Sequence, residues 1–338
     1  MSSPLDAAAG LRPVSGSAAD LLALLRDWEA ADDPPPLLVE TSGSTGRPKR
    51  VVLPRAAMRA SADATHARLG GAGQWLLTLP PTYVAGLQVL FRSVRAGTEP
   101  AADVSELGDG ARYVSLVPTQ LARRLDDGLA ALRTFDRVLV GGARLDPALR
   151  LRAEQAGVRV VATYGMSETC GGCVYDGRPL DGVRVAVADD GRVRIGGPVV
   201  FAGYEERPEL TAQVLRDGWF VTSDLGRLER DGTLHVLGRV DDVVVSGGLN
   251  VPAGAVAQRL REHPRVRDAE VVGVADDEWG QRVVAVLVGD LSLDEARDWV
   301  ALQHPRAWAP RNVVPVAALP LLPNGKVDRV AVERLAGG

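Results

Sequence analysis

Residues 41–49 read Thr41-Ser42-Gly43-Ser44-Thr45-Gly46-Arg47-Pro48-Lys49 and lie between two short apolar runs. Glycines let backbone N–H groups come close to an anion, and the hydroxyls and the lysine add further donors. The stretch is therefore suited to holding phosphate. It is not a Walker A loop, because only two residues separate its glycines and Pro48 obstructs a helix at this point. We predict strand, loop and strand here; an ordinary Ser/Gly-rich surface turn is the alternative.

The bulk composition limits the classes of protein that fit. A chain of 338 residues predicts about two domains, and 46% apolar with 24% charged residues is ordinary for a globular protein. The net charge of −4 gives no basic footprint, so we expect no nucleic-acid partner. No apolar run approaches the ~20 residues that span a bilayer, and residues 1–10 lack a signal-peptide layout. We expect a cytoplasmic protein.

The two cysteines, Cys170 and Cys173, form a C-x-x-C pair. A redox motif would need a thioredoxin-like context, and zinc would need about two more ligands nearby. The four histidines are scattered along the chain. We therefore expect buried or half-buried free thiols.

The middle of the chain alternates strands with helices. We predict strands over 113–117, 138–140 and 158–163, and helices over 119–125 and 147–155. This alternation implies parallel strands joined by helical crossovers, and such sheets bind ligands beyond the C-terminal strand ends. Two segments fall there, Gly141-Gly142-Ala143 and Tyr164-Gly165-Met166-Ser167-Glu168-Thr169. Ordinary strand-to-helix turns are the alternative, but a carboxylate and two hydroxyls at a strand exit favour a site.

The two ends of the chain differ in pattern from its middle. Near the N-terminus we predict helices over 18–31 and 55–69, and from residue 180 short strands and turns indicate a β-rich subdomain. After Asp241 the composition changes, with a glycine-rich segment at 246–250 that we expect to be flexible. A capping box, Ser292 to Glu295, opens a helix in this last part. We place a boundary there, giving a large domain over 1–240, with 180–240 β-rich, and a small domain over 241–338.

Taken together, six motifs resemble those of the acyl-adenylate-forming ligases, which include acyl-CoA synthetases, peptide-synthetase adenylation domains and luciferases. They occur in the family's order and cover nearly the whole chain: residues 41–49, 164–169, 218–224, 238–241, 245–251 and 322–328. The resemblance implies an α/β fold with a large N-terminal domain of layered sheets, its β-rich subdomain and a small, mobile α+β C-terminal lid. The phosphate loop begins near residue 41, so the chain looks like an N-terminally shortened member of the family. In the family, the missing part normally packs against the main sheet and contributes to the binding site of the thiol.

The resemblance also implies roles for individual residues, with ATP, Mg²⁺ and CoA as cofactors or co-substrates. Lys326, Glu168 and Thr169 would be catalytic: Lys326 as the mobile lysine, Glu168 as the Mg²⁺ ligand and Thr169 near the α-phosphate. Asp241 would be the hinge between the domains. The residues expected to bind ATP are Thr41, Ser42, Gly43, Ser44, Thr45, Gly46, Lys49, Gly141, Gly142, Tyr164, Gly165, Asp224 and Arg239.

The implied reaction has two steps. A carboxylate attacks the α-phosphorus of ATP to give an acyl-AMP and pyrophosphate, and a thiol then displaces AMP. Mg²⁺ and Lys326 would stabilise the charge that gathers in the first transition state. Between the steps the small domain would rotate about Asp241, a motion that the neighbouring Gly247-Gly248 pair suits.

The acid pocket of the family corresponds here to Tyr83, Gly86 and Met166. This region, residues 167–177 and the short N-terminus look most like the compact o-succinylbenzoate–CoA ligases of menaquinone biosynthesis. Such a substrate is a dicarboxylate, and its second carboxylate needs a cation or donors. Arg92, Arg95 and Arg144 stay open for this role, and each could equally be a surface residue.

Other functions remain open. Another acyl- or aryl-CoA ligase is the nearest alternative, and a catalytically silent nucleotide-binding regulator is a more distant one, disfavoured by the intact Lys326 and Glu168. A peptide-synthetase domain is disfavoured because no carrier-protein segment follows Lys326. We expect small-molecule partners only, with a homodimer left open as the oligomeric state.

Overall fold

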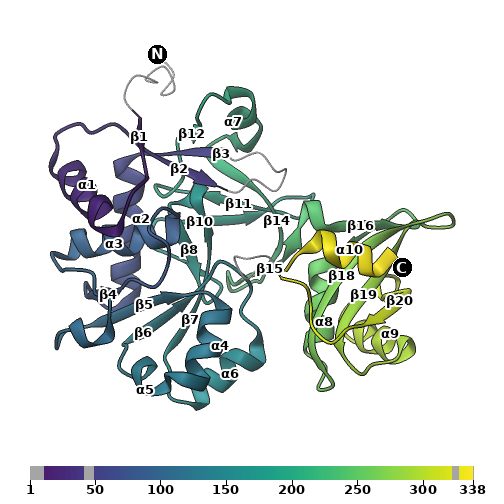
Figure 1. Cartoon of the computed structure of the whole chain (residues 1–338). Coiled ribbons are helices and arrows are strands. Elements are labelled where there is room, and N and C mark those ends of the chain that lie inside the picture. The colour runs from purple at the N-terminus through teal and green to yellow at the C-terminus, as the bar shows by residue number, and fades with distance from the viewer. Residues whose placement is uncertain (1–10, 42–48, 322–326, 338) are drawn as a thin grey trace. The chain divides into compact units, whose positions relative to one another are not determined.

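The computed structural model describes residues 11–41, 49–321 and 327–337. It divides into two compact units, each made of several chain segments. The first comprises Met1–Ala186, Arg194–Thr222 and Leu228–Leu234, and the second comprises Val187–Val193, Ser223–Arg227 and His235–Gly338. Figure 1 labels their helices and strands. Of the helices in the described ranges, none combines the length and apolar character needed to cross a bilayer.

A small sheet in the first unit carries the predicted phosphate loop. Its strand order is β1-β2-β3-β12, formed by β1 (Arg12–Pro13), β2 (Leu37–Thr41), β3 (Lys49–Leu53) and β12 (Gly203–Tyr204). β2 and β3 are antiparallel, and Thr41 lies opposite Lys49. The prediction of strands on both sides of the loop is therefore confirmed, while residues 42–48 lie outside the described part of the chain.

A larger sheet forms the middle of the first unit. Its order is β4-β5-β6-β7-β8-β9, formed by β4 (Gln74–Leu76), β5 (Arg112–Leu116), β6 (Arg137–Val140), β7 (Val160–Met166), β8 (Gly171–Tyr175) and β9 (Arg178–Pro179). β4 to β7 are parallel, as predicted. The prediction that the last of these strands ends at Thr163 is wrong. β7 continues to Met166 because its final residues leave β6 and pair antiparallel with β8.

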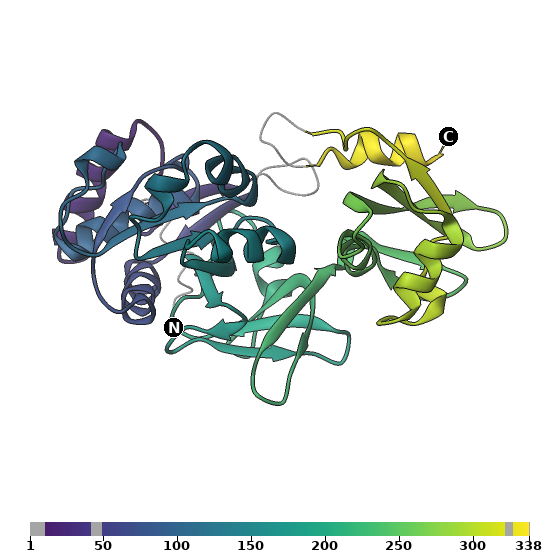
Figure 2. The same cartoon turned by 90° about the horizontal axis from the view of Figure 1, so that it is seen from below.

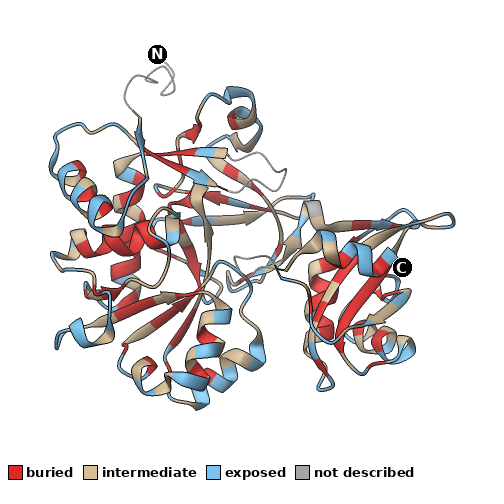
Figure 3. Ribbon diagram, in the orientation of Figure 1, coloured by how far each residue is buried: buried red, intermediate tan, exposed pale blue. Residues whose placement is uncertain are grey.

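Helices cover both faces of this sheet (Figures 1 and 2). On one face lie α1 (Ala18–Ala30), α2 (Arg55–Leu69) and α3 (Val84–Ala96), and on the other lie α4 (Pro118–Asp127), α5 (Leu129–Leu132) and α6 (Pro147–Gln155). α2 and α3 contact β8, and together with α1 they share an apolar core with β2 and β3. These helices therefore lie between the two sheets, and the buried residues in Figure 3 follow this layering.

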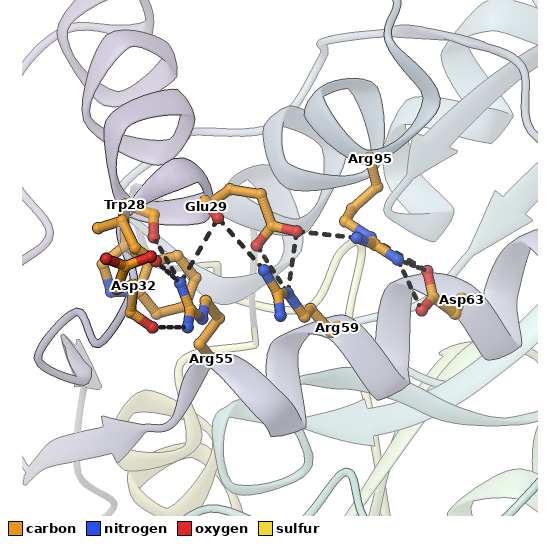
Figure 4. Close-up of polar contacts among 8 residues, drawn as sticks. Trp28, Glu29, Asp32, Arg55, Arg59, Asp63 and Arg95 are labelled. Carbon is orange, nitrogen blue, oxygen red and sulfur yellow. Dashed lines mark hydrogen bonds and ion pairs between the residues drawn. The ribbon is translucent and has the colours of Figure 1, made fainter.

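A charged cluster joins α1, α2 and α3 at their edge (Figure 4). The Glu29 carboxylate of α1 accepts hydrogen bonds from Arg59 of α2 at 2.9 Å and from Arg95 of α3 at 2.8 Å. Arg95 also pairs with Asp63 of α2 at 2.9 Å. Arg55 donates to the backbone carbonyls of Trp28, in the last turn of α1, and of Ala31 and Asp32 just after the helix. Glu29 is thus the point at which all three helices meet.

The β-rich segment forms a third sheet with order β10-β11-β14-β13, in which β15 also pairs with β14. Its strands are β10 (Arg184–Val187), β11 (Arg192–Gly196), β13 (Leu215–Arg216), β14 (Trp219–Leu228) and β15 (Leu234–Arg239). The predicted β-rich character of this segment is confirmed. Sequence reasoning missed the long strand β14 and the helix α7 (Pro208–Val214).

The second unit contains a sheet of order β17-β16-β19-β18 with β20 beside β19. Its elements are β16 (Val243–Ser246), β17 (Leu249–Pro252), α8 (Ala253–Arg261), β18 (Val266–Asp276), β19 (Gly280–Gly289), α9 (Leu293–Ala301), β20 (Asn312–Pro315) and α10 (Arg329–Gly337). α8 and α9 pack on one face of this sheet, and α10 packs on the other. The capping box at Ser292 is confirmed. The glycine-rich segment forms the turn of an antiparallel hairpin, with Ser246 opposite Leu249. Its expected flexibility stays a prediction.

Candidate active site

The two strands that flank the phosphate loop are tied together at its base. The Thr41 hydroxyl donates to the carbonyl oxygen of Lys49 at 3.2 Å. The Lys49 ammonium lies 5.4 Å from the centre of the Tyr204 ring on the neighbouring strand β12, within the range of a cation–π contact. The other predicted loop residues lie outside the described part of the chain, so their phosphate contacts stay predictions: Ser42, Gly43, Ser44, Thr45 and Gly46.

Glu168 lies in a short 3-10 turn (Ser167–Thr169) that follows β7. Its Oε1 accepts a hydrogen bond from the Tyr204 hydroxyl at 2.8 Å, and its carbonyl oxygen accepts from the Phe201 amide at 2.9 Å. Burial, reinforced by the Glu168 charge, raises the pKa of Tyr204, so this phenol is the proton donor of the pair. The structure therefore joins Lys49, Tyr204 and Glu168 in one chain of contacts.

The residues after Glu168 are anchored from two helices. Cys170 is in the left-handed region with a φ of 52°, and its carbonyl oxygen accepts hydrogen bonds from Ser61 of α2 at 2.9 Å and from Gln88 of α3 at 2.7 Å. The Thr169 side chain is fully buried, and its hydroxyl lies 2.8 Å from the carbonyl oxygen of Gly171. Its predicted place near the α-phosphate stays a prediction. Sequence reasoning missed Ser61 and Gln88, although polar side chains within apolar helix faces were a usable signal.

The predicted adenine-flanking residues lie at one edge of the larger sheet. Gly141 follows β6 directly, and Tyr164 and Gly165 lie in the last part of the neighbouring strand β7. Gly141 is half-buried, whereas Gly142 is exposed. A Cβ on Gly165 would lie 2.1 Å from the carbonyl oxygen of Gly171, so glycine is required for the close approach of β8. Packing alone accounts for that glycine, and its contact with ATP stays a prediction.

The predicted acid-pocket residues surround the start of α3. Tyr83 is the N-cap residue of this helix, and its side chain is 55% exposed. Gly86 is buried in the first turn, where a Cβ would lie 2.3 Å from the carbonyl oxygen of Pro80. Met166, at the end of β7, is half-buried and packs against the apolar core that contains α3. Their contact with an acid substrate stays a prediction.

Two turns further along α3, Arg92 is buried with only 4% of its surface exposed. Its guanidinium lies 4.9 Å from the Trp75 ring centre and donates to the Tyr175 hydroxyl at 3.5 Å, while its Nε has no hydrogen-bond partner in the described residues. Burial lowers the pKa of Arg92. Burial, together with the Arg92 charge, lowers the pKa of His66 on α2 to about 4. Within residues 11–41, 49–321 and 327–337, no carboxylate pairs with Arg92.

The remaining predicted site residues belong to the second unit. Asp224 lies on β14 and Arg239 on the paired strand β15, within that unit's segments. Asp241 lies in a 3-10 turn (Val240–Asp242) directly after β15. Lys326 lies outside the described residues. Their roles stay predictions.

Metal ligands and thiols complete the inventory of reactive groups. Among the described residues, no three His, Cys, Asp or Glu side chains converge as a preformed metal cage. Cys170 and Cys173 are buried free thiols, as predicted. Burial raises the pKa of both thiols, that of Cys173 to about 12, so neither is a reactive thiolate near neutral pH.

Comparison with known protein families identifies the class of protein. The profile of the AMP-binding enzymes matches residues 27–205, and that of the AMP-binding enzyme C-terminal domain matches residues 255–326. The chain therefore belongs to the AMP-binding enzyme family. This confirms the predicted fold class and the resemblance to adenylate-forming ligases.

Individual relatives narrow the similarity further. A Mycobacterium tuberculosis protein named a probable 2-succinylbenzoate–CoA ligase is 48% identical over 94% of this chain and 89% of its own length. A 2-succinylbenzoate–CoA ligase of Bacillus mycoides is 33% identical over 76% of this chain, which spans only 61% of that protein. The solved o-succinylbenzoate CoA synthetase of Bacillus subtilis, in complex with its acyl-adenylate intermediate, is 28% identical with a TM-score of 0.74, over 88% of this chain and 68% of that one.

Proposed function

We propose that this chain is an AMP-forming acid–thiol ligase that converts o-succinylbenzoate, ATP and CoA to o-succinylbenzoyl-CoA, AMP and pyrophosphate, a step of menaquinone biosynthesis. The 48% identity to the M. tuberculosis ligase over nearly all of both chains carries this proposal. The Bacillus subtilis synthetase, which has also been solved in complex with ATP and a magnesium ion, supports the two-step route through an acyl-adenylate. We also propose a cytoplasmic location, where ATP and CoA are available.

Arg92 is our choice among the three arginines for the second carboxylate of the substrate. Arg95 is already paired with Glu29 and Asp63, and Arg144 is exposed. Arg92 is a buried cation without a carboxylate partner in the described residues, a costly arrangement that an anionic ligand would relieve. It also lies on α3, whose first turn holds the predicted acid pocket.

Glu168 fits a magnesium site of the kind that ATP-dependent enzymes use. Mg²⁺ prefers oxygen ligands and is commonly held by one or two carboxylates together with substrate phosphates. The Glu168 carboxylate supplies such oxygens, and one of them already has a donor in Tyr204. When bound, Mg²⁺ would offset the negative charge of the phosphates. Lys49 would place a second positive charge near the phosphate loop.

The domain boundary at Asp241 and the mobile role of Lys326 are part of the same proposal. Asp242, beside the proposed hinge, pairs with Arg329 at 2.5 Å, and Arg329 opens α10 three residues after Lys326. This contact within the second unit links the hinge turn to the segment that bears the lysine. Rotation about Asp241 would then move Lys326 together with the small domain.

A substrate panel tests the proposal. Pyrophosphate and AMP release are measured with o-succinylbenzoate, benzoate, 2-acetylbenzoate and fatty acids, each with and without CoA. We expect CoA-thioester formation with o-succinylbenzoate at a kcat/KM at least tenfold above that for the other acids. Turnover of benzoate analogues in preference to o-succinylbenzoate would point to another aryl-CoA ligase. Absence of turnover with every acid would favour a silent nucleotide-binding protein.

A further inference from the structure

Tyr204 touches two residues that are predicted to act on the nucleotide, although it belongs to none of the phosphate-binding motifs. Its hydroxyl donates to Oε1 of Glu168 at 2.8 Å. The face of its ring lies 5.4 Å from the Lys49 ammonium. Glu168 lies 36 residues earlier in the chain, in the 3-10 turn after β7. Lys49 lies on β3, the strand that pairs with Tyr204's own strand β12. Tyr204 therefore bridges the end of the phosphate loop and the proposed metal ligand.

Packing and hydrogen bonds hold Tyr204 in a single place. The residue is 2% exposed, and its ring packs edge-on against Phe201 at 4.9 Å. Its strand β12 pairs with β3, opposite Val51. Its backbone amide donates to the buried Thr211 hydroxyl at 2.9 Å. A side chain fixed in this way can impose an orientation on its partners, because it has little freedom to follow them.

We propose that Tyr204 is a positioning residue that orients the Glu168 carboxylate toward the magnesium–nucleotide complex and links it to Lys49. The terminal torsion of a glutamate is broad, so the carboxylate plane is poorly defined unless a neighbour holds one oxygen. Because the Tyr204 hydroxyl holds Oε1, Oε2 is left in a defined direction and would be available to a metal ion. Partners of this kind orient metal-binding carboxylates in many proteins. The inference rests on the proposed ATP-dependent function.

The Lys49 contact adds a reason for the bridge. A cation over the face of a phenol draws electron density from the ring and makes its hydroxyl a better donor. Lys49 would thereby strengthen the hydrogen bond to Glu168 while its charge stays close to the loop. The arrangement lets one tyrosine couple the position of the loop's last residue to that of the metal ligand.

The test measures magnesium-dependent ATP binding rather than turnover alone. Calorimetry determines the Kd of ATP for the full chain in Mg²⁺ and in EDTA, for the wild type, Tyr204→Phe and Tyr113→Phe. We expect Tyr204→Phe to bind ATP with the wild-type Kd in EDTA. The factor by which Mg²⁺ increases the affinity for ATP should be about 10-fold smaller in this variant than in the wild type. The Mg²⁺ concentration for half-maximal pyrophosphate release should rise by a similar factor while the KM for the acid is unchanged. Wild-type magnesium dependence in Tyr204→Phe would overturn the inference.

Two controls separate positioning from loosened packing. Tyr113→Phe removes the same group from a tyrosine of equal burial, whose hydroxyl donates to the Gly71 carbonyl at 3.1 Å, and should leave the magnesium dependence unchanged. Thr211→Val removes the backbone anchor of Tyr204 but keeps its hydroxyl, and should also retain most of the magnesium effect. An equal loss in Tyr204→Phe and Thr211→Val would refute a role for the hydroxyl.

A double-mutant cycle tests whether Tyr204 acts through Glu168. Once Glu168→Gln has removed the charged ligand, adding Tyr204→Phe should change the magnesium-dependent gain by less than twofold. Fully additive losses would overturn the inference. ATP binding is read without any acid present, so an incorrect acid substrate would leave these outcomes interpretable, whereas failure of the wild type to bind ATP would refute the proposed function itself.

Discussion

Replacing Arg92 by methionine should impair recognition of a dicarboxylic acid without destabilising the fold. Arg92 is 4% exposed. Among the described residues it makes one long hydrogen bond, at 3.5 Å to Tyr175, and a cation–π contact with Trp75. Exchanging a buried ionic group for a packed apolar one is often neutral or stabilising by roughly 1–4 kcal/mol. The lost cation–π contact offsets about 0.5–2 kcal/mol of that gain. The net effect on the free energy of unfolding should therefore lie between about zero and a modest increase.

Whereas the fold should not lose stability, the affinity for the acid substrate should fall. Removing one partner of a buried, hydrogen-bonded charge pair costs about 2 kcal/mol or more, which is a factor of roughly 30 or more in affinity. Arg92→Met should therefore raise the KM for o-succinylbenzoate by at least that factor. The KM for benzoate, which has no second carboxylate, should change little. The change in the ratio of the two kcat/KM values between the wild type and Arg92→Met reports the contribution of the guanidinium.

Steady-state kinetics and thermal unfolding of the same preparations check both halves of the prediction. Arg95→Met is the matched control on the same helix, because it removes an arginine that is paired with Glu29 and Asp63. That variant should lower the apparent Tm and leave the substrate ratio unchanged. An unchanged KM for o-succinylbenzoate in Arg92→Met, or a Tm lowered below that of Arg95→Met, would refute our assignment of Arg92.

Four further outcomes are expected. Burial lowers the pKa of His66 from 6.5 to about 4, so between these pH values the unfolded chain binds a proton that the folded chain does not. The contribution of His66 to stability is therefore complete above pH 6.5, and the free energy of unfolding falls by up to about 3 kcal/mol toward pH 4. In pH-dependent denaturation, His66→Gln should remove this loss. Glu29→Gln should cost about 1–2 kcal/mol in urea unfolding, because two arginines lose a charged partner, and an unchanged midpoint would contradict the role of the cluster. Lys326→Ala should abolish adenylate formation yet spare thioester formation from supplied acyl-AMP, and equal loss of both half-reactions would contradict its role. Asp241→Pro should do the reverse, and an unchanged overall rate would count against a rotating domain.

Local patterns in the sequence were sufficient for most of the elements. The helix over 55–69 was predicted to the residue, and the parallel strands around 113–117 and 138–140 were placed within one residue at each end. The end of β7 was not predicted correctly, because the residues up to Met166 belong to the strand through their antiparallel pairing with β8, which follows a reversal of the chain. The hairpin at Ser246 was not predicted for the same reason: its glycines form a turn between two strands that pair with each other. Periodicity describes each segment by itself and carries no information on such pairings.

The candidate site shows the same limit at the level of side chains. Glu168 was predicted because it lies within a motif, but the Tyr204 hydroxyl that holds its carboxylate lies in another segment. The same is true of Ser61 and Gln88, which hold the carbonyl of Cys170, two residues further on. No local pattern distinguishes these residues from ordinary buried polar groups. Arg92 could be proposed only as one of three arginines, and its burial, which depends on the packing of α3, was needed to select it.

The arrangement around Glu168 explains why its supporting residues had to come from distant segments. Cys170 has a left-handed backbone that is unfavourable for a residue with a Cβ, so the turn would relax unless its surroundings prevented it. The hydrogen bonds from Ser61 and Gln88 to the Cys170 carbonyl hold the turn in place. The hydrogen bond from Tyr204 holds the carboxylate of Glu168. These donors lie on α2, α3 and β12, elements that belong to the core shared by the two sheets. A carboxylate that this core orients in advance would need little further ordering on meeting a metal–phosphate complex, which is the role that we propose for Glu168.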